Sequence, residues 1–165
     1  MNPVTLVAQK MLTDPQNNLH DINHLLKVYG YAKTIGELEG LPPQTQRVLE
    51  VAALVHDIAC PLCRQKYGHA DGAHQQIEGE PMARAFLEGT GLDAREIERV
   101  AYLVGHHHTL EGIDGIDWQI LLEADYLVNA DENGASKEAI ASTLRTMYRT
   151  ESGSALLRAI YLRGE

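Results

Sequence analysis

The sequence predicts an all-α protein, built as a single-domain bundle of seven to eight helices. Apolar residues recur every three or four positions through most of its 165 residues, whereas the alternation of apolar and polar residues that marks strands is absent. The length is that of one domain, and neither an internal repeat nor a linker interrupts it. We therefore expect one helical domain over residues 1–165.

The same periodicity places the elements. Helices are expected over residues 3–12, 17–39 and 44–59, and the third should be central and most buried because it is apolar on most sides. A loop over 60–73 separates it from helices over 74–88 and 93–105, and Asp93 and Glu96 have the spacing of a capping box. A second loop, 106–115, precedes a helix through 118–128. Ser136 and Ser152 are expected to cap two closing helices within 136–163.

Charge and cysteine content limit the function classes. The chain has 14 Lys and Arg against 23 Asp and Glu, a net charge of -9, which argues against nucleic acid polymers and anionic membranes as partners. A phosphorylated ligand would then need a local positive charge, for which a metal ion is suited. Two cysteines cannot form a disulfide framework, and neither a signal peptide nor an apolar run of about 20 residues is evident. We expect a cytoplasmic protein.

Four residues are candidates for a functional site in the predicted core. His56 and Asp57 close an apolar run, where an imidazole and a carboxylate are unfavourable unless both have partners. Adjacent helical residues point about 100° apart, so both side chains can reach one ion. Asp125 falls on the buried stripe of its helix and Glu123 off it, while His24 faces the core from the second helix. Alone, Asp125 would more often be a cap or a hydrogen-bond partner, and His24 a half-exposed histidine of an amphipathic helix. Together the four residues suit iron, manganese, zinc, cobalt or nickel.

This order of residues in an all-helical chain resembles the HD superfamily of metal-dependent phosphohydrolases over about residues 18–130. The segments 21–28, 53–58 and 122–127 carry the likeness. The resemblance implies a divalent-metal site with His24, His56, Asp57 and Asp125 as ligands. It also implies hydrolysis of a phosphate ester in a nucleotide or similar small metabolite, by water that the metal activates and that Asp57 or Asp125 deprotonates.

The loop after the His-Asp pair adds two features. Arg64 and Lys66 can neutralise the charge of a substrate phosphate, although solvated loop charges would look the same. Cys60 and Cys63 form a CxxC motif without a second such motif. Ordinary reduced thiols beside the metal are the first interpretation, and a redox pair or an accessory metal ligand is the alternative.

Three consecutive histidines at 106–108 follow an apolar helix. In binuclear members of the HD superfamily a His pair at this place serves a second metal, which implies that role for His106 and His107. With one ion only, the pair would instead contact the substrate phosphate and act in catalysis. The further ligand of a second ion is left open among His74, His69 and Glu78.

The substrate is not fixed by these motifs. The Gly-Tyr-Pro signature of cyclic-dinucleotide phosphodiesterases and the acidic pair of guanosine tetraphosphate hydrolases are both missing from the sequence. His108-Thr109 is similar to diadenosine tetraphosphate hydrolases, but only in part. Two alternatives remain: a catalytically idle sensor that binds metal or nucleotide, and a di-iron oxygenase. Turnover distinguishes the first alternative, and a mixed-valent iron signal distinguishes the second.

Overall fold

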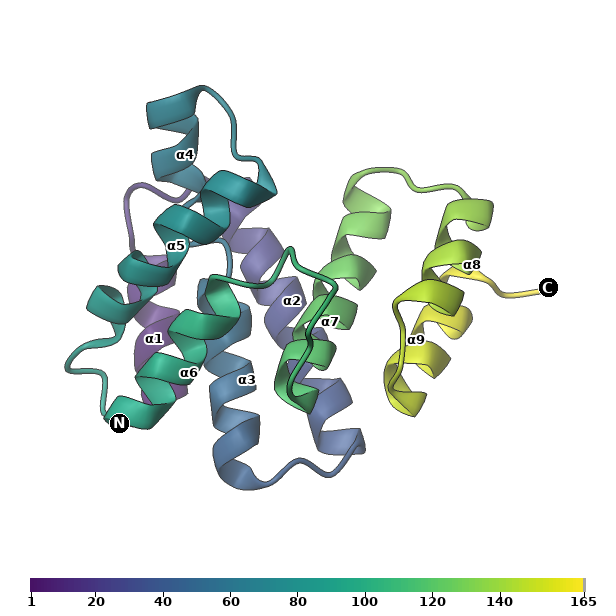
Figure 1. Ribbon diagram of the computed structural model, residues 1–165, viewed down its shortest axis with the longest axis horizontal. Coiled ribbons are helices and arrows are strands. Elements are labelled where there is room, and N and C mark those ends of the chain that lie inside the picture. Colours follow the sequence, from purple (N-terminus) through teal and green to yellow (C-terminus); the bar gives the residue numbers. More distant parts are fainter. Residues whose placement is uncertain (165) are drawn as a thin grey trace.

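The computed structural model describes residues 1–164, and every regular element in them is a helix. The helices are α1 (Pro3–Leu12), α2 (Leu19–Leu38), α3 (Pro43–Val55), α4 (Cys60–Tyr67), α5 (Gly72–Leu87), α6 (Ala94–Val104), α7 (Ile116–Glu132), α8 (Lys137–Thr146) and α9 (Glu151–Tyr161). In Figure 1, α2, α3 and α7 occupy the middle, with α1, α5 and α6 on one side and α8 and α9 on the other. The all-α prediction is confirmed, with nine helices in the described residues rather than seven or eight.

The helix that the sequence did not predict is α4, which lies within the loop expected over 60–73. Pro61 lies in its first turn, where a missing N–H leaves no hydrogen bond unmade. Gly68 ends it with φ of 79°, a left-handed conformation that glycine adopts without strain. The proline and glycine that suggested a loop therefore mark the two ends of a short helix.

The third helix is shorter than predicted, and this matters for the site. It ends at Val55, and residues 56–59 form tight turns. The Ile58 N–H donates to the Val55 carbonyl at 3.0 Å and the Cys60 N–H to the Asp57 carbonyl at 2.9 Å. These bonds span three residues instead of four, as in a 3₁₀ turn. His56 and Asp57 consequently lie in a turn just beyond the helix.

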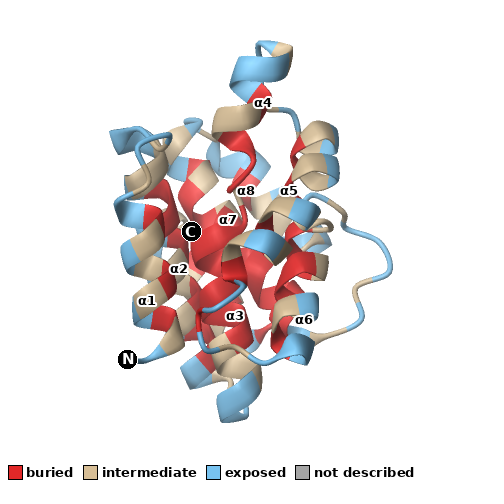
Figure 2. Cartoon of the chain, turned by 90° about the vertical axis from the view of Figure 1, so that its left-hand side faces the viewer, coloured by how far each residue is buried: buried red, intermediate tan, exposed pale blue. Residues whose placement is uncertain are grey.

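The core is built around two helices instead of one. Residues 48–55 of α3 are all buried, but α7 is buried along nearly its whole length as well. Figure 2 shows the buried residues gathered on α2, α3 and α7. The prediction that α3 is central is confirmed, and α7 shares that position with it.

The prediction that Glu123 lies off the buried stripe is wrong, since its exposed fraction is 0%. The segment from α8 to α9 covers this side of α7. The Glu123 carboxylate accepts hydrogen bonds there from the Gln119 amide at 2.7 Å, the Arg149 N–H at 2.7 Å and the Thr150 N–H at 3.0 Å. A buried carboxylate is tolerated because several donors satisfy it.

The helix caps follow the predictions with one exception. Asp93 and Glu96 form the predicted capping box of α6, and Ser136 caps α8 by accepting the Ala139 N–H at 3.1 Å. Ser152 does not cap α9. Thr150 does so instead, because the contact of its hydroxyl with Glu123 fixes it at the helix start. In the described part of the chain, no helix combines the length and apolar character needed to cross a membrane.

Candidate metal centre

Four predicted ligands converge in the interior, from α2, from the turn after α3 and from α7. His24 Nε2 lies 3.1 Å from His56 Nε2, 3.3 Å from Asp57 Oδ2 and 3.2 Å from Asp125 Oδ1. His56 Nε2 lies 3.4 Å from each of the same two carboxylate oxygens. Atoms that coordinate one ion at about 2.0–2.2 Å are separated from one another by roughly 3 Å. The spacing of the four atoms is that of a coordination shell.

The orientation of both imidazoles is set by their other nitrogen. His56 Nδ1 donates to the Ala53 carbonyl at 2.8 Å, and His24 Nδ1 lies 2.9 Å from Glu132 Oε2. Because a carbonyl or carboxylate oxygen only accepts, the hydrogen sits on Nδ1 and leaves the lone pair on Nε2. Two lone pairs thus face each other across 3.1 Å, an arrangement that a cation between them stabilises.

Glu132 was missed in the sequence analysis. It lies seven residues after Asp125, two turns along the same face of α7, and that spacing was the available signal. Its carboxylate contacts His24 from the side opposite the centre, in the position where metal-binding histidines commonly have an acceptor.

The charge of the centre also favours a cation. Asp125 Oδ1 is buried without a hydrogen-bond partner among the described residues, which is unfavourable for a carboxylate unless a positive charge compensates. Burial lowers the pKa of His56, but the carboxylates of Asp57 and Asp125 outweigh it and raise the pKa to about 9. The two carboxylates therefore favour a positive charge at this place. Two imidazole nitrogens and two carboxylate oxygens fit a divalent iron, manganese, zinc, cobalt or nickel ion.

His107 extends the centre on the other side of Asp57. Its Nδ1 donates to the Val104 carbonyl at 2.8 Å, so the Nε2 lone pair is free, buried and without a hydrogen-bond partner among the described residues. That atom lies 3.3 Å from Asp57 Oδ1, while Asp57 Oδ2 faces His24 and His56. The carboxylate of Asp57 is thus shared between two groups of ligands.

A second ion would find its ligands in Asp57, His107 and His108, whose donor atoms lie within 4.8 Å of one another. The sequence analysis did not assign His108 to this group. Its ring is held by Gln75, with His108 Nε2 at 2.8 Å from the Gln75 amide oxygen. Gly72 allows the His108 ring to lie close to the backbone of α5, because a side-chain carbon at position 72 would lie 2.9 Å from that ring.

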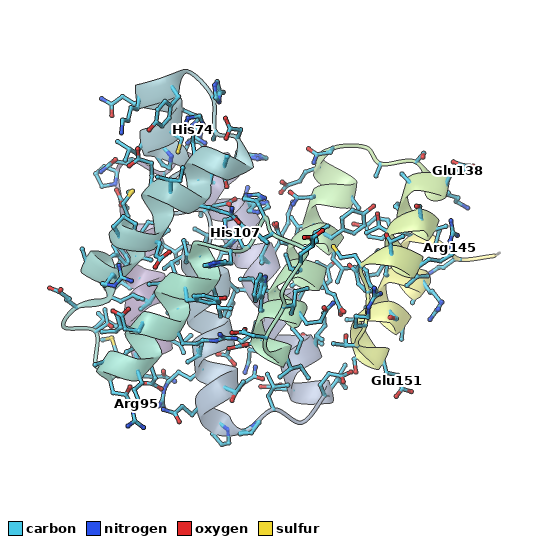
Figure 3. All side chains as sticks on the ribbon, in the orientation of Figure 1. His74, Arg95, His107, Glu138, Arg145 and Glu151 are labelled. Atoms are coloured by element: carbon cyan, nitrogen blue, oxygen red, sulfur yellow. The ribbon has the colours of Figure 1, made fainter. Side chains whose placement is uncertain are left out.

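His106 and His74 are placed elsewhere. The His106 ring stacks on Tyr102 at 3.9 Å between centroids and meets the Trp118 ring at 5.5 Å. Figure 3 shows His74 beside α4, well away from His107 near the middle of the molecule. The geometry therefore does not assemble His74, His106 and His107 around one point.

Glu78 and Lys66 pair with each other, with Lys66 Nζ 2.5 Å from Glu78 Oε1. Tyr67 donates to the same carboxylate oxygen at 2.6 Å. Neither residue of the pair is part of the cavity wall beside the centre. Arg64 does line that wall, and its guanidinium donates to both carboxylate oxygens of Asp21, at 2.6 and 3.1 Å.

The cavity has a volume of about 200 Å³ and contains His24 and Asp57 in its wall. Asn129 of α7 and Asn133, the residue that caps its C-terminal end, add amide groups. Cys60 also lines it, and burial together with the charge of Asp57 raises the pKa of its thiol. Cys60 and Cys63 are both free cysteines, and neither forms a disulfide.

Comparisons with known proteins agree with this arrangement. The family model of the HD domain matches residues 21–147, a range that contains all four predicted ligands of the centre. None of the curated proteins matches the chain by sequence. A structure described as a predicted HD superfamily hydrolase, from an uncultured Thermotogales bacterium, is 24% identical with a TM-score of 0.66 and covers 97% of this chain and 83% of its own. YpgQ of Bacillus subtilis is 18% identical with a TM-score of 0.61, and the match covers 98% of this chain and 91% of YpgQ. Both show the same fold.

Proposed function

The chain belongs to the HD domain family, and from this premise we propose that it is a metal-dependent phosphohydrolase. It would cleave a phosphate ester of a nucleotide or similar small phosphorylated metabolite. The observation that carries the proposal is the meeting of two imidazole lone pairs with the buried Oδ1 of Asp125, which lacks a hydrogen-bond partner among the described residues. A cation held between these atoms would balance the two imidazole nitrogens and the buried carboxylate oxygen.

The residues of the centre would have separate roles in the reaction. His24, His56, Asp57 and Asp125 would hold a divalent ion, which polarises a phosphoryl oxygen and makes water a better nucleophile near neutral pH. Asp57 is the most exposed of the four ligands, with 31% of its side chain accessible, and its carboxylate can accept a proton from a water in the cavity. Arg64, which pairs with Asp21 in the cavity wall, would supply positive charge to the substrate phosphate.

The cavity supports a small substrate. About 200 Å³ is below the usual range of roughly 300–1,000 Å³ for pockets of drug-sized ligands, so it suits the phosphate end of a small molecule. Asn129 and Asn133 can hydrogen-bond to a sugar or base beyond the phosphate. The net charge of -9 disfavours a nucleic acid polymer as substrate.

The test combines metal content with turnover. The purified protein, loaded with manganese, iron, cobalt or nickel, is assayed for phosphate release from a panel of nucleotides and phosphorylated metabolites. Asp57→Ala should lose metal and hydrolysis while its helical circular dichroism stays the same. Asp131→Ala, at an exposed position of α7, serves as control and should keep both. Nucleotide binding without phosphate release would contradict the proposal and favour a sensor. A mixed-valent iron signal with oxygen consumption would favour an oxygenase instead.

A further inference from the structure

A second group of metal-binding side chains lies outside the centre, where α4 connects to α5. His69 Nδ1 is 3.0 Å and His74 Nδ1 is 2.7 Å from the same atom, Oδ2 of Asp71. The three donor atoms lie within 4.8 Å of one another. Two imidazoles and one carboxylate thus converge within six residues of the chain, and none of them belongs to the proposed hydrolytic centre.

The local backbone holds these side chains in place. Gly68 ends α4 in the left-handed conformation and turns the chain back towards α5. Asp71 is the N-cap of α5, and its Oδ1 accepts the His74 N–H at 2.9 Å. This bond fixes the carboxylate with Oδ2 turned towards both imidazoles. The capping bond uses Oδ1, while Oδ2 accepts the His74 Nδ1–H at 2.7 Å, a hydrogen bond that a metal ion would replace as the proton is released.

Tyr67 forms a wall behind the group. Its ring packs on the His74 ring at 3.9 Å between centroids and lies 6.5 Å from the His69 ring. Its hydroxyl donates to Glu78, so the ring itself is anchored. The His74 imidazole is therefore restricted in rotation, which reduces the entropy that binding an ion would remove.

The exposure of the group leaves room for an ion. The exposed fractions of the side chains are 59% for His69, 44% for Asp71 and 36% for His74. Water can complete the coordination shell on the open side, and His69, the most exposed member, can turn to close the shell. Two imidazole nitrogens with one carboxylate select divalent transition ions such as Zn²⁺ over the all-oxygen ligands of Ca²⁺ or Mg²⁺.

We propose that His69, Asp71 and His74 form a separate binding site for a divalent transition metal ion of the Zn²⁺ class. An ion there would tie the connection at 68–71 to the first turn of α5. Ala70, between His69 and Asp71, and Gln75, next to His74, line the cavity of the main centre, so the ion would stabilise the rim of that cavity. The inference stands on the triad alone and does not depend on the proposed function.

The test counts zinc ions on the full chain by native mass spectrometry with Zn²⁺ alone. Asp71→Ser keeps a capping oxygen for the His74 N–H but removes the ligand oxygen, so it should bind one zinc equivalent fewer than wild type. The matched control is Asp93→Ser, the same replacement at the N-cap of α6, which should bind as many equivalents as wild type. Equal stoichiometry in all three proteins overturns the proposal.

A second measurement locates the ion. Hydrogen exchange of the amides at 68–75 should slow by roughly tenfold when free Zn²⁺ is about ten times its dissociation constant. The slowing should persist in Asp57→Ala, which disables the main centre, and vanish in the double variant His69→Gln with His74→Gln. Slowing that is lost in Asp57→Ala, or kept in the double variant, would show that zinc acts from elsewhere and would overturn the assignment.

Discussion

The Nε2 atoms of His24 and His56 lie 3.1 Å apart although each ring has an acceptor at its Nδ1 that leaves Nε2 as a lone pair. Both rings are buried, with exposed fractions of 6% and 1%. Their approach would be repulsive in a protein that held no positive charge between them. A cation between these two atoms would tie α2 to the turn after α3.

Glu132 is predicted to position His24 for the metal. Glu132→Ala removes the acceptor that fixes the tautomer, and we expect metal affinity or hydrolysis to fall roughly 10- to 100-fold. Glu132→Gln retains an oxygen at the same place and should recover much of the loss. Calorimetric titration with Mn²⁺ measures the effect, with the exposed neighbour Asp131→Ala as control. Unchanged affinity in Glu132→Ala would remove Glu132 from this role.

His107 is predicted to matter more than His106. His107→Ala should lower kcat/KM by roughly 100-fold or more, since Nε2 of His107 is the buried atom that faces Asp57. His106→Phe keeps the ring that stacks on Tyr102 and should leave metal content as in wild type. Steady-state kinetics and elemental analysis of both variants decide between them. A larger loss in His106→Phe would restore the assignment made from the sequence.

Arg64 and Lys66 are predicted to differ in their effect on the KM for a phosphorylated substrate. Arg64→Gln should raise KM for a phosphorylated substrate roughly tenfold, about the contribution of one charged hydrogen bond, and it leaves Asp21 unbalanced in the cavity wall. Lys66→Gln removes the same charge two residues away, where it pairs with Glu78 outside the cavity, and should leave KM unchanged. Equal effects on KM would mean that the charges act at long range rather than by contact.

Glu123 is predicted to stabilise the packing of α8 and α9 on α7. Glu123→Ala leaves the N–H groups of Arg149 and Thr150 without their acceptor, and should lower the free energy of unfolding by about 2 kcal/mol or more. Glu138 points into solvent on α8 (Figure 3), and Glu138→Ala should change this free energy by no more than about 0.5 kcal/mol. Urea unfolding followed by circular dichroism gives both values. A loss below 0.5 kcal/mol in Glu123→Ala would contradict the assigned network.

The sequence predicted most helices because their signals are local. Apolar spacing of three and four residues fixes which face of a helix is buried, and caps such as Asp93 with Glu96 act within one turn. The sequence did not predict α4, because a proline and a glycine such as Pro61 and Gly68 occur in loops as well as at the two ends of a short helix. It failed at Glu123 because the layer that covers this residue comes from a segment about 25 residues later.

The sequence by itself determined the chemistry available at the site: the types of the four candidate ligands and their order along the chain. The tertiary structure decided which further groups join them. His107 faces Asp57 while its neighbour His106 packs on an aromatic pair, and His74 lies with His69 and Asp71. The physical reason is that each of these residues lies in a loop or at a helix end. There the direction of a side chain depends on how distant helices pack, and helical spacing does not encode that direction.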